Sequence, residues 1–285
     1  MRNLKGKTAL VTGASRGIGA HLARALADRG MNLAIAARSA VDLQRVQGEL
    51  ELKGIQVLSV SIDVADPVAL QAMVEQVLQA FGSIDLLVNN AGLDQCAIYP
   101  EFSRDKIQQI IDVNLTAPML LTHMVLPHML KQGEGHVVNI ASVAGLVGVA
   151  YNEAYAATKH GIVGFTRSLA ATAEGEAWPL GFSCILPGFI ADAGMFVEMT
   201  SHVRGEGVPL SGVSSLEKVC AETIKAIECD RLEVVVNPVP FRPLAIFLLL
   251  FPRATQWALR VTGAIGWFKA VAAGRREAPP DDNQV

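Results

Sequence analysis

Short, continuous apolar segments alternate along this chain with longer segments in which apolar residues recur at helical spacing, and no other feature constrains the fold as strongly. Continuous apolar runs of this kind are typical of strands that are buried on both faces of a sheet. Strands joined by helical segments form βαβ units and a parallel sheet. The pattern therefore predicts an α/β fold with a doubly wound, parallel, seven-stranded sheet. The predicted strands are residues 8–12, 32–37, 57–62, 84–88, 136–140, 182–186 and 233–236.

The sequence also predicts the long helices and the division of the chain into a domain, an extension and a tail. The segment 107–129 is the longest, and Pro118 and Pro127 are expected to interrupt it. Another helix is predicted at 155–173. Because no repeat or linker divides the chain, residues 1–240 are predicted to form a single domain. An apolar and basic helical extension follows at 241–276, and the tail at 277–285 is expected to be disordered.

Composition excludes several classes of protein. Of the 285 residues, 51% are hydrophobic and 18% are charged, which is too apolar for a disordered chain. The formal net charge is −3, so no bulk positive field is present to hold nucleic acid, and no such partner is expected. The four cysteines form no CxxC pair, which predicts reduced, mostly buried thiols, a cytoplasmic location and no metal site. No apolar leader follows the N-terminus, and no window of 18 uncharged, apolar residues occurs, so the sequence predicts neither a signal peptide nor a transmembrane helix.

A glycine-rich turn connects the first predicted strand to the first helix. Residues 12–19 read TGASRGIG. Glycines at such a turn let the backbone approach a phosphate closely, and the N-terminus of the following helix offers free N–H groups and a favourable dipole. The spacing is GxxxGxG rather than the general GxGxxG of dinucleotide-binding folds. The turn favours a dinucleotide site, with an ordinary strand-to-helix turn as the alternative.

The turn and several later motifs resemble those of the classical short-chain dehydrogenases/reductases. The resemblance covers about residues 5–238. It implies a Rossmann-type, dinucleotide-binding catalytic domain with strand order 3-2-1-4-5-6-7. The matching elements are NNAG at 89–92, DVNL around Asn114, IASVAG around Ser142, YxxxK from Tyr155 to Lys159, and PG at 187–188.

The resemblance also implies an activity and the residues that perform it. It implies an oxidoreductase that interconverts a ketone and a secondary alcohol with a nicotinamide dinucleotide, and that assembles as a homodimer or homotetramer. The implied catalytic residues are Asn114, Ser142, Tyr155 and Lys159. The implied cofactor-binding residues are Gly13, Ser15, Arg16, Gly17, Ile18, Gly19, Arg38, Asp63, Val64, Asn90, Ala91, Gly92, Tyr155, Lys159, Pro187, Gly188 and Ile190.

The spacing of Tyr155 and Lys159 suits proton transfer. Positions i and i+4 share one face of a helix, and an ammonium beside a phenol is expected to lower the tyrosine pKa. A tyrosine tuned in this way can give a proton to a developing alkoxide or remove one from an alcohol. The resemblance assigns Lys159 a second contact, with the nicotinamide ribose. The alternative for this pair is a tyrosine packed on a core helix beside a solvated lysine.

Ser142 and Asn114 have roles that the resemblance implies. Ser142 follows the fifth strand, at the carboxyl edge where open α/β sheets bind ligands, and it would orient and polarise the substrate carbonyl. Its alternative is a helix N-cap. Asn114 lies in a helical stretch that asparagine does not favour, and it would hold a water that links to Lys159 as a proton relay. Its alternative is a satisfied core amide.

The charge after the second strand favours NADP(H) over NAD(H). An acidic residue there would bind a ribose 2′-hydroxyl and repel a 2′-phosphate, but this chain has two alanines followed by Arg38. Arg16 lies within the glycine-rich turn, and two guanidinium groups suit a phosphate. The alternative is that both arginines face solvent. Asp63 and Val64 match the adenine contact of the family.

One position departs from the family pattern. The family commonly has a threonine four residues after Gly188, where it holds the nicotinamide carboxamide, but this chain has Asp192. An aspartate cannot reproduce a hydroxyl, so Asp192 is left out of the predicted site. Residues 193–212, which include Met195, Phe196 and Met199, are expected to form an apolar lid over a lipophilic substrate such as a steroid, a retinoid or a 3-oxoacyl chain. An ordinary surface helix and loop is the alternative.

The extension at 241–276 combines apolar, aromatic and basic residues. Its apolar run 244–251 is too short to span a bilayer, but aromatic anchors with basic partners suit an interfacial helix at a membrane surface. The same residues equally suit a helix that covers the substrate pocket or a subunit contact. Peripheral membrane attachment is therefore one hypothesis, and packing against protein is the other.

These features together predict an NADP(H)-dependent oxidoreductase that acts on a small-molecule carbonyl or alcohol. An alternative from a different class is a catalytically silent NADP-binding or membrane-associated scaffold, which would need none of the four catalytic residues. An epimerase or dehydratase on a related fold would be expected to carry a turn of the TGxxGxxG type, and the spacing at residues 12–19 contradicts that assignment.

Overall fold

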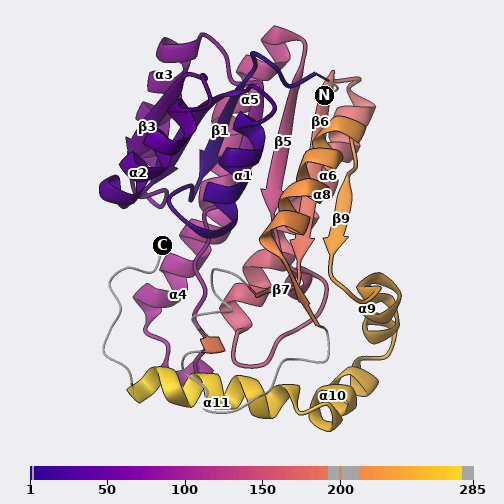
Figure 1. The fold of residues 1–285 in the computed structure, drawn as a ribbon. Helices are drawn as coiled ribbons and strands as arrows, with labels where there is room; N and C mark the ends of the chain where they lie inside the picture. Colours follow the sequence, from indigo (N-terminus) through magenta and orange to yellow (C-terminus); the bar gives the residue numbers. More distant parts are fainter. Residues whose placement is uncertain (2, 192–198, 201–211, 278–285) are drawn as a thin grey trace.

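Seven parallel strands form the central sheet of the molecule (Figure 1). The computed structural model describes residues 1, 3–191, 199–200 and 212–277. Within them the order across the sheet is β3-β2-β1-β4-β5-β6-β9, so the predicted fold class and the predicted strand order are confirmed. The strands are β1 (Thr8–Thr12), β2 (Asn32–Ala37), β3 (Val57–Ser61), β4 (Leu86–Asn89), β5 (Gly135–Ile140), β6 (Leu180–Pro187) and β9 (Glu233–Val236).

The register places the ends of β1 and β2 side by side. Thr12 lies opposite Ala36, and the backbone N–H of Ala14, just beyond β1, donates to the Ala36 carbonyl at 3.1 Å. A further two-stranded sheet pairs β7 (Phe189–Ile190) with β8 (Val213–Ser214). Strands of two residues are too short to show any periodicity, which is why the sequence did not predict this pair.

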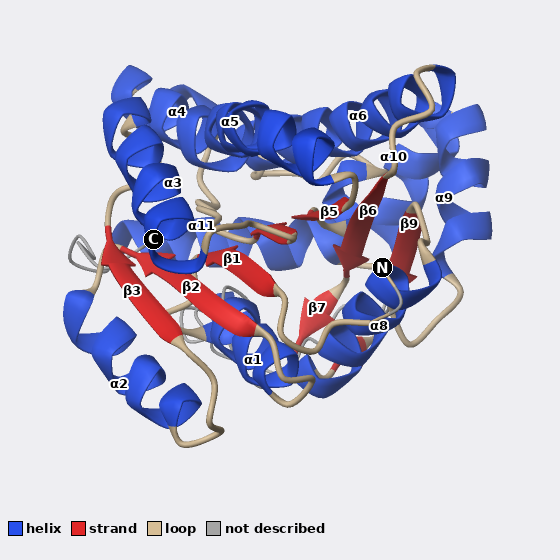
Figure 2. Cartoon of the chain, turned by 90° about the horizontal axis from the view of Figure 1, so that it is seen from above, coloured by secondary structure: helices blue, strands red, loops and turns tan. Residues whose placement is uncertain are grey.

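Helices cover both faces of the sheet (Figure 2). Polar N-caps mark where several of them begin: Ser39 precedes α2, Asp66 precedes α3 and Ser215 precedes α8, each accepting a bond from a backbone N–H of the first turn. One face carries α1 (Gly17–Ala27), α2 (Ala40–Glu51) and α8 (Leu216–Cys229). The opposite face carries α3 (Pro67–Phe81), α4 (Arg104–Ile111), α5 (Ala117–Gln132) and α6 (Glu153–Gly175).

The two prolines expected to interrupt the helix at 107–129 do not do so, and that prediction is wrong. The helical stretch runs from Arg104 to Gln132, with a π-helical segment, η2 (Asp112–Thr116), between α4 and α5. Pro118 falls in the first turn of α5, where the missing backbone N–H of a proline costs no hydrogen bond within α5. Pro127 lies inside α5, and the burial of Leu121, Val125 and Met129 against the sheet compensates for its missing donor.

The same stretch, Arg104–Gln132, is the one described helix that is long and apolar enough to cross a membrane by length and hydropathy. In its most apolar window, 44% of the residues are buried within the protein. Figure 2 places α4 and α5 along the sheet beside α3 and α6. The apolar composition of this helix is therefore explained by its position in the core.

A chain of buried polar side chains crosses the middle of the sheet. The amide of Asn89 on β4 donates to Asn139 Oδ1 on β5 at 2.8 Å and to Thr122 Oγ1 at 3.2 Å. The Asn139 amide in turn donates to Thr166 Oγ1 on α6 at 2.9 Å. Because buried polar groups are costly unless bonded, this network fixes β4, β5 and α6 relative to one another. These elements carry the residues predicted to do the chemistry.

His136 lies on β5 with no exposed surface, and its Nε2 is 2.9 Å from Ser183 Oγ on β6. Burial lowers the pKa of His136 to about 3, and the positive charge of the chain's N-terminus acts in the same direction. The folded protein therefore keeps this imidazole neutral well below about pH 6.5, where the imidazole of an unfolded chain gains its proton.

Acid should therefore destabilise the fold through His136. The folded pKa lies below the unfolded one, so stability from this group is complete above about pH 6.5 and is lost as the pH falls toward 3. When the pH is lowered from about 7 to about 5, the free energy of unfolding should fall by about 2 kcal/mol less in His136→Gln than in the wild type. Urea denaturation at both pH values measures the difference. Exposed His128 on α5 provides the control His128→Gln, which should behave as the wild type; an equal acid loss in His136→Gln would contradict the assignment.

The extension predicted at 241–276 consists of three helices, α9 (Phe241–Leu250), α10 (Pro252–Val261) and α11 (Ala264–Glu277). Figure 1 shows α9 beside β9, and α11 running beneath the carboxyl ends of the strands toward α4. Glu277, predicted to begin the tail, belongs to α11, and residues 278–285 lie outside the described part of the chain. The extension thus reaches the edge of the sheet where ligands of open α/β folds bind.

Candidate active site

Two glycines of the turn between β1 and α1 are required by close contacts. Gly13 has a positive φ of 65°, and a Cβ there would lie 2.8 Å from Ala91 Cα. A Cβ on Gly19 would lie 2.2 Å from the Gly13 carbonyl oxygen. By contrast, Gly17 also has a positive φ, of 56°, but nothing lies within 4 Å of the position of its Cβ. The turn is thus packed tightly against the protein at Gly13 and Gly19 and open at Gly17.

Asn90 and Ala91 of the NNAG motif hold this turn in place. The Asn90 amide donates to the carbonyls of Thr12 at 2.9 Å and of Gly13 at 3.1 Å. The backbone N–H groups of Asn90 and Ala91 donate to Thr12 Oγ1 at 3.0 and 3.1 Å. The side chain of Asn90, predicted to bind the cofactor, therefore acts in the structure as a brace between β4 and the turn.

The start of α1 is built to accept an anion. Arg16 precedes the helix in an extended conformation, its side chain does not cap the helix, and the first turn contains no acidic residue. The N–H groups of this turn and the helix dipole are therefore available to a phosphate. Because Ala14 bonds to the end of β2, the exposed Arg16 and the half-buried Arg38 belong to neighbouring segments of the same edge.

These residues fit a dinucleotide with an additional phosphate. The space over Gly17 and the uncapped helix start provide a backbone surface for phosphates, and Arg38 follows β2 in place of an acidic residue. Lys106 on α4 faces the same region, since burial and then the charges of Arg38 and Arg275 lower its pKa. The sequence did not point to Lys106, because only the fold brings α4 beside the end of β2.

The other predicted cofactor-binding residues lie along the same edge. Ser15 and Val64 are buried, and Ile18 and Gly92 are half-buried. Asp63 uses its carboxylate within the chain, where Oδ1 accepts from the Ala65 N–H at 2.9 Å. At the end of β6, Pro187 and Ile190 are buried, and a Cβ on Gly188 would lie 2.3 Å from Asn237 Oδ1.

The fold brings Ser142, Tyr155 and Lys159 together at the end of β5. Ser142 precedes the short 3-10 helix η3 (Val143–Gly145), and its Oγ accepts from the Ala144 N–H at 3.2 Å, so the N-cap alternative holds locally. The Ser142 side chain also acts on Tyr155, whose pKa it lowers, and its Oγ is 3.5 Å from the Pro187 carbonyl. Lys159 Nζ donates to the Ile140 carbonyl at 2.9 Å and lies 5.5 Å from the centre of the Tyr155 ring.

Burial dominates the protonation of both titratable side chains in this group. Burial raises the pKa of Tyr155, the charge of Asp94 adds to the shift, and the hydrogen bond with Ser142 opposes it. Burial lowers the pKa of Lys159 to about 8. The prediction that Lys159 lowers the tyrosine pKa is thus wrong in this structure. The ammonium is held at the Ile140 carbonyl and near the ring rather than at the phenol oxygen, so it does not offset the burial.

Asn114 lies in η2, and its amide is fully bonded. Its Oδ1 accepts from the Leu93 N–H at 2.7 Å, and its Nδ2 donates to the Leu93 carbonyl at 2.8 Å and to Thr158 Oγ1 at 3.2 Å. The side chain is therefore the satisfied core amide of the alternative interpretation, and it ties the segment after β4 to α6. A π-helical turn at this point also fits a functional position, because such turns often accompany sites.

Asp94 and Cys96 belong to the site although the sequence did not single them out. Asp94 is 4% exposed, and its charge raises the pKa of Tyr155. Cys96 is buried, and its Sγ is 3.4 Å from the Phe268 carbonyl on α11. Burial raises the pKa of Cys96 to about 12, so it is an inert thiol. As predicted, the cysteines are free, and all except Cys229 are buried.

An apolar cluster forms between α11 and the segments that follow β4, β5 and β6. Phe189 contacts Trp267 and Phe268, with ring centres 5.8 and 6.4 Å apart. Of the predicted lid, Asp192, Met195 and Phe196 lie outside the described residues, whereas Met199 is buried in this cluster. The buried members are Cys96, Met199, Phe268, Val271 and Ala272, and Val149, Tyr151, Phe189 and Trp267 pack against them.

Polar contacts attach α11 to the segment that follows β4. Arg276 forms an ion pair with Glu101, with Nε donating to Oε2 at 2.6 Å. Glu101 belongs to the short 3-10 helix η1 (Tyr99–Glu101). With the Cys96–Phe268 bond, this pair holds α11 across the carboxyl edge of the sheet. At α11 the extension thus packs against protein, and whether it covers a substrate stays a prediction.

Comparison with known proteins agrees with this geometry. A family model described as short chain dehydrogenase matches residues 7–204. A ketoacyl reductase, HetN, of Nostoc sp. is 36% identical over 250 residues, which cover 88% of this chain and 85% of the relative.

Two solved structures share the fold over most of their length. A short chain dehydrogenase/reductase from Burkholderia phymatum in complex with NAD is 29% identical, with a TM-score of 0.74 and coverage of 82% of this chain and 90% of that one. A metagenomic short-chain oxidoreductase in complex with NADP is 30% identical, with a TM-score of 0.70 and coverage of 83% and 99%.

Proposed function

The chain belongs to the short-chain dehydrogenase family, and from this premise we propose that it reduces a ketone to a secondary alcohol, or the reverse, with a preference for NADP(H). The observation that carries the proposal is the meeting of Ser142, Tyr155 and Lys159 at the carboxyl end of β5. A silent scaffold would have no need for this hydrogen-bonded group beside a buried acid.

The chain's own residues handle the proton. Tyr155 is protonated at neutral pH, because burial and Asp94 raise its pKa. It can therefore donate its proton to a ketone oxygen as that oxygen gains negative charge. Ser142, which acts on the phenol, can donate to the same ketone oxygen and orient it. Lys159, with a pKa of about 8, is poised to exchange a proton near neutral pH. The nicotinamide cofactor, when bound, supplies or accepts the hydride.

The preference for NADP(H) follows from charge. Arg16 and Arg38 flank the open backbone surface over Gly17, and Arg38 stands directly after β2 where an acidic residue would repel a 2′-phosphate. Lys106 adds a third cation to this region. One structural neighbour is in complex with NAD and the other with NADP. The proposed cofactor preference therefore rests on the charged residues of this chain.

We infer a lipophilic substrate of the 3-oxoacyl type. The walls beside the catalytic group are apolar and aromatic, and they include Phe189, Phe268 and Val271. Apolar walls with few polar groups suit the hydrocarbon part of a ligand. The similarity to a ketoacyl reductase supports an acyl chain over a steroid or retinoid. A cytoplasmic location and a homodimer or homotetramer remain predictions that accompany this proposal.

Purified protein should oxidise NADPH in the presence of 3-oxoacyl thioesters, and kcat/KM should rise with acyl chain length as more methylene groups enter the apolar wall. Each buried methylene is worth up to about fourfold in kcat/KM. Absorbance of NADPH at saturating cofactor measures the rates.

The control is Phe268→Ala, which shortens the wall without touching the catalytic group. It should reduce the gain with chain length and leave activity on the shortest substrate close to that of the wild type. NADPH binding without turnover on any ketone, aldehyde or thioester would contradict the enzyme assignment and favour the scaffold.

A further inference from the structure

The outer faces of α9 and α10 expose an unusual concentration of large apolar side chains. Elsewhere among the described residues such side chains are scattered, as with Val41 on α2 and Val68 on α3, each 78% exposed. On α9, α10 and their junction, the exposed fraction ranges from 47% at Leu244 to 70% at Leu250. The apolar patch consists of Leu244, Ile246, Phe247, Leu249, Leu250, Phe251, Trp257 and Val261.

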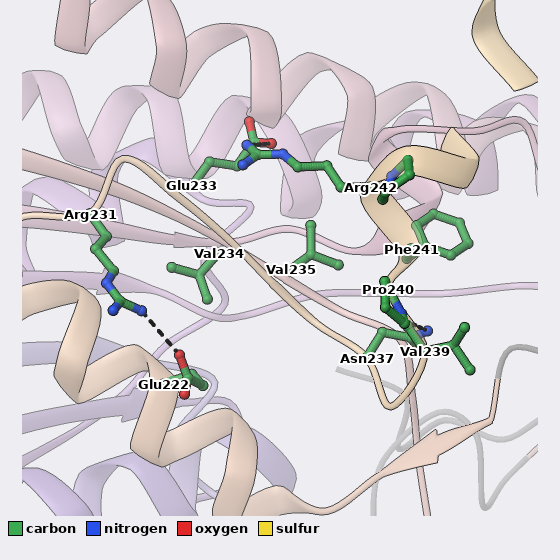
Figure 3. A pocket seen from close by; sticks show the side chains of 11 residues that line it. Glu222, Arg231, Glu233, Val234, Val235, Asn237, Val239, Pro240, Phe241 and Arg242 are labelled. Atoms are coloured by element: carbon green, nitrogen blue, oxygen red, sulfur yellow. Dashed lines mark hydrogen bonds and ion pairs between the residues drawn. The ribbon is translucent and has the colours of Figure 1, made fainter. Parts of the chain in front are cut away.

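The patch stands on helices that are attached to the core. At the start of α9, Arg242 pairs with Glu233 of β9 at 2.6 Å, and Arg167 of α6 pairs with the same carboxylate at 2.6 Å. Figure 3 shows Arg242 reaching back along β9 to Glu233. Ala245 on the inner face of α9 is buried against the core. The apolar side chains therefore face outward because the opposite face of α9 is already occupied.

The second helix is joined to the first. Thr255 Oγ1 on α10 donates to the Leu248 carbonyl on α9 at 2.7 Å. The rings of Phe247 and Phe251 lie 5.0 Å apart at the junction. Trp257 and Val261, four positions apart on α10 and each 66% exposed, extend the same patch. The two joined helices thus both expose large apolar side chains.

The extension is positively charged, unlike the chain as a whole. Residues 241–276 contain six basic residues and no acidic residue, whereas the whole chain has a net charge of −3. Arg242 and Arg276 are paired with Glu233 and Glu101. The exposed basic residues near the patch are Arg253, Arg260 and Lys269.

We propose that the apolar patch on α9 and α10 docks on an anionic lipid surface. Exposed Phe and Trp side chains would enter the headgroup region, and Arg253, Arg260 and Lys269 would contact the lipid phosphates. Each helix has 10 residues, about 15 Å in length. This is half of the roughly 30 Å of a bilayer core, so both helices lie in the plane of the surface and do not span it.

The charge pattern favours lipid over a second copy of the chain. A symmetric contact through this patch would bring the basic residues of both copies to one interface, with no acidic residue in 241–276 to pair with them. An anionic lipid surface supplies the missing negative charge. The chain continues from α10 directly into α11, so docking would hold the apolar cluster of α11 close to a source of lipophilic molecules.

Sedimentation of the full-length protein with lipid vesicles tests the proposal independently of any activity. The protein should sediment with vesicles that contain phosphatidylglycerol and much less with phosphatidylcholine alone, and high salt should weaken the binding. Two double variants should each lower the partition coefficient by roughly tenfold or more. These are Phe251→Ser with Trp257→Ser, and Arg253→Glu with Arg260→Glu.

The matched control is Val41→Ser with Val68→Ser, which removes even more exposed apolar side chains from α2 and α3 and should leave binding unchanged. Because all of these positions are exposed, unaltered thermal unfolding will show that each variant is folded. Absence of wild-type sedimentation, or wild-type binding by the Phe251 and Trp257 variant, would overturn the proposal. Light scattering that shows a dimer lost in the patch variants, without vesicle binding, would assign the patch to a second copy instead.

Discussion

Tyr155→Phe should lower kcat by roughly 10²–10⁴-fold, the usual contribution of a positioned general acid. The change removes the phenol oxygen that is proposed to give the proton and keeps the ring that packs beside Lys159. The dissociation constant for NADPH should stay close to that of the wild type, because the glycine-rich turn and Arg38 are untouched. Steady-state kinetics and the fluorescence of bound NADPH measure the two quantities separately.

Tyr151 offers a matched control for this variant. It packs against the apolar cluster of α11 and is not one of the residues proposed to act on the reacting oxygen. Tyr151→Phe should therefore keep most of the activity. Loss of cofactor binding in Tyr155→Phe, together with near-normal turnover at saturating cofactor, would rule out the proposed role of the phenol.

Arg38→Asp should reverse the cofactor preference. The wild type should show a higher kcat/KM with NADPH than with NADH, because a guanidinium after β2 pairs with a 2′-phosphate and an acidic residue there does not. The substitution adds repulsion as well as removing attraction, so we expect the ratio of the two kcat/KM values to change by roughly 100-fold or more. The same substrate is used for both cofactors.

Lys225→Asp provides the comparison for a simple change in charge. Lys225 is exposed on α8, a helix that carries none of the proposed phosphate contacts. Lys225→Asp should leave the ratio of kcat/KM with NADPH to kcat/KM with NADH unchanged. If the wild type uses NADH as well as NADPH, Arg38 and Arg16 do not recognise a 2′-phosphate, and the proposed preference is wrong.

The sheet was predictable from sequence because each strand is a local signal. β1, β2 and β9 begin and end where the apolar runs do, and the remaining central strands shift by no more than two residues at either end. Their order needed the family resemblance, since the apolar pattern alone does not rank neighbours. Ser142, Tyr155 and Lys159 could be predicted because their spacing is local in the sequence.

The features that sequence did not predict depend on contacts between distant segments. Asp94 influences Tyr155 only because the amide of Asn114 holds Leu93 and the segment after β4 beside α6. The pKa of Tyr155 is raised rather than lowered because burial is the largest influence on it, and burial cannot be read from a YxxxK motif. The helix through Pro118 and Pro127 persists because tertiary packing overrides local propensity.

The position of α11 has a consequence for how the protein is made. Its contacts are with Cys96, Phe189 and Glu101, which precede it by many residues, whereas β9 and all other strands of the central sheet come before it in the chain. During synthesis the sheet can therefore assemble while its carboxyl edge is still uncovered. The apolar cluster is completed only when α11 leaves the ribosome, so a nascent chain can hold a nearly complete fold before the wall proposed to contact the substrate is in place.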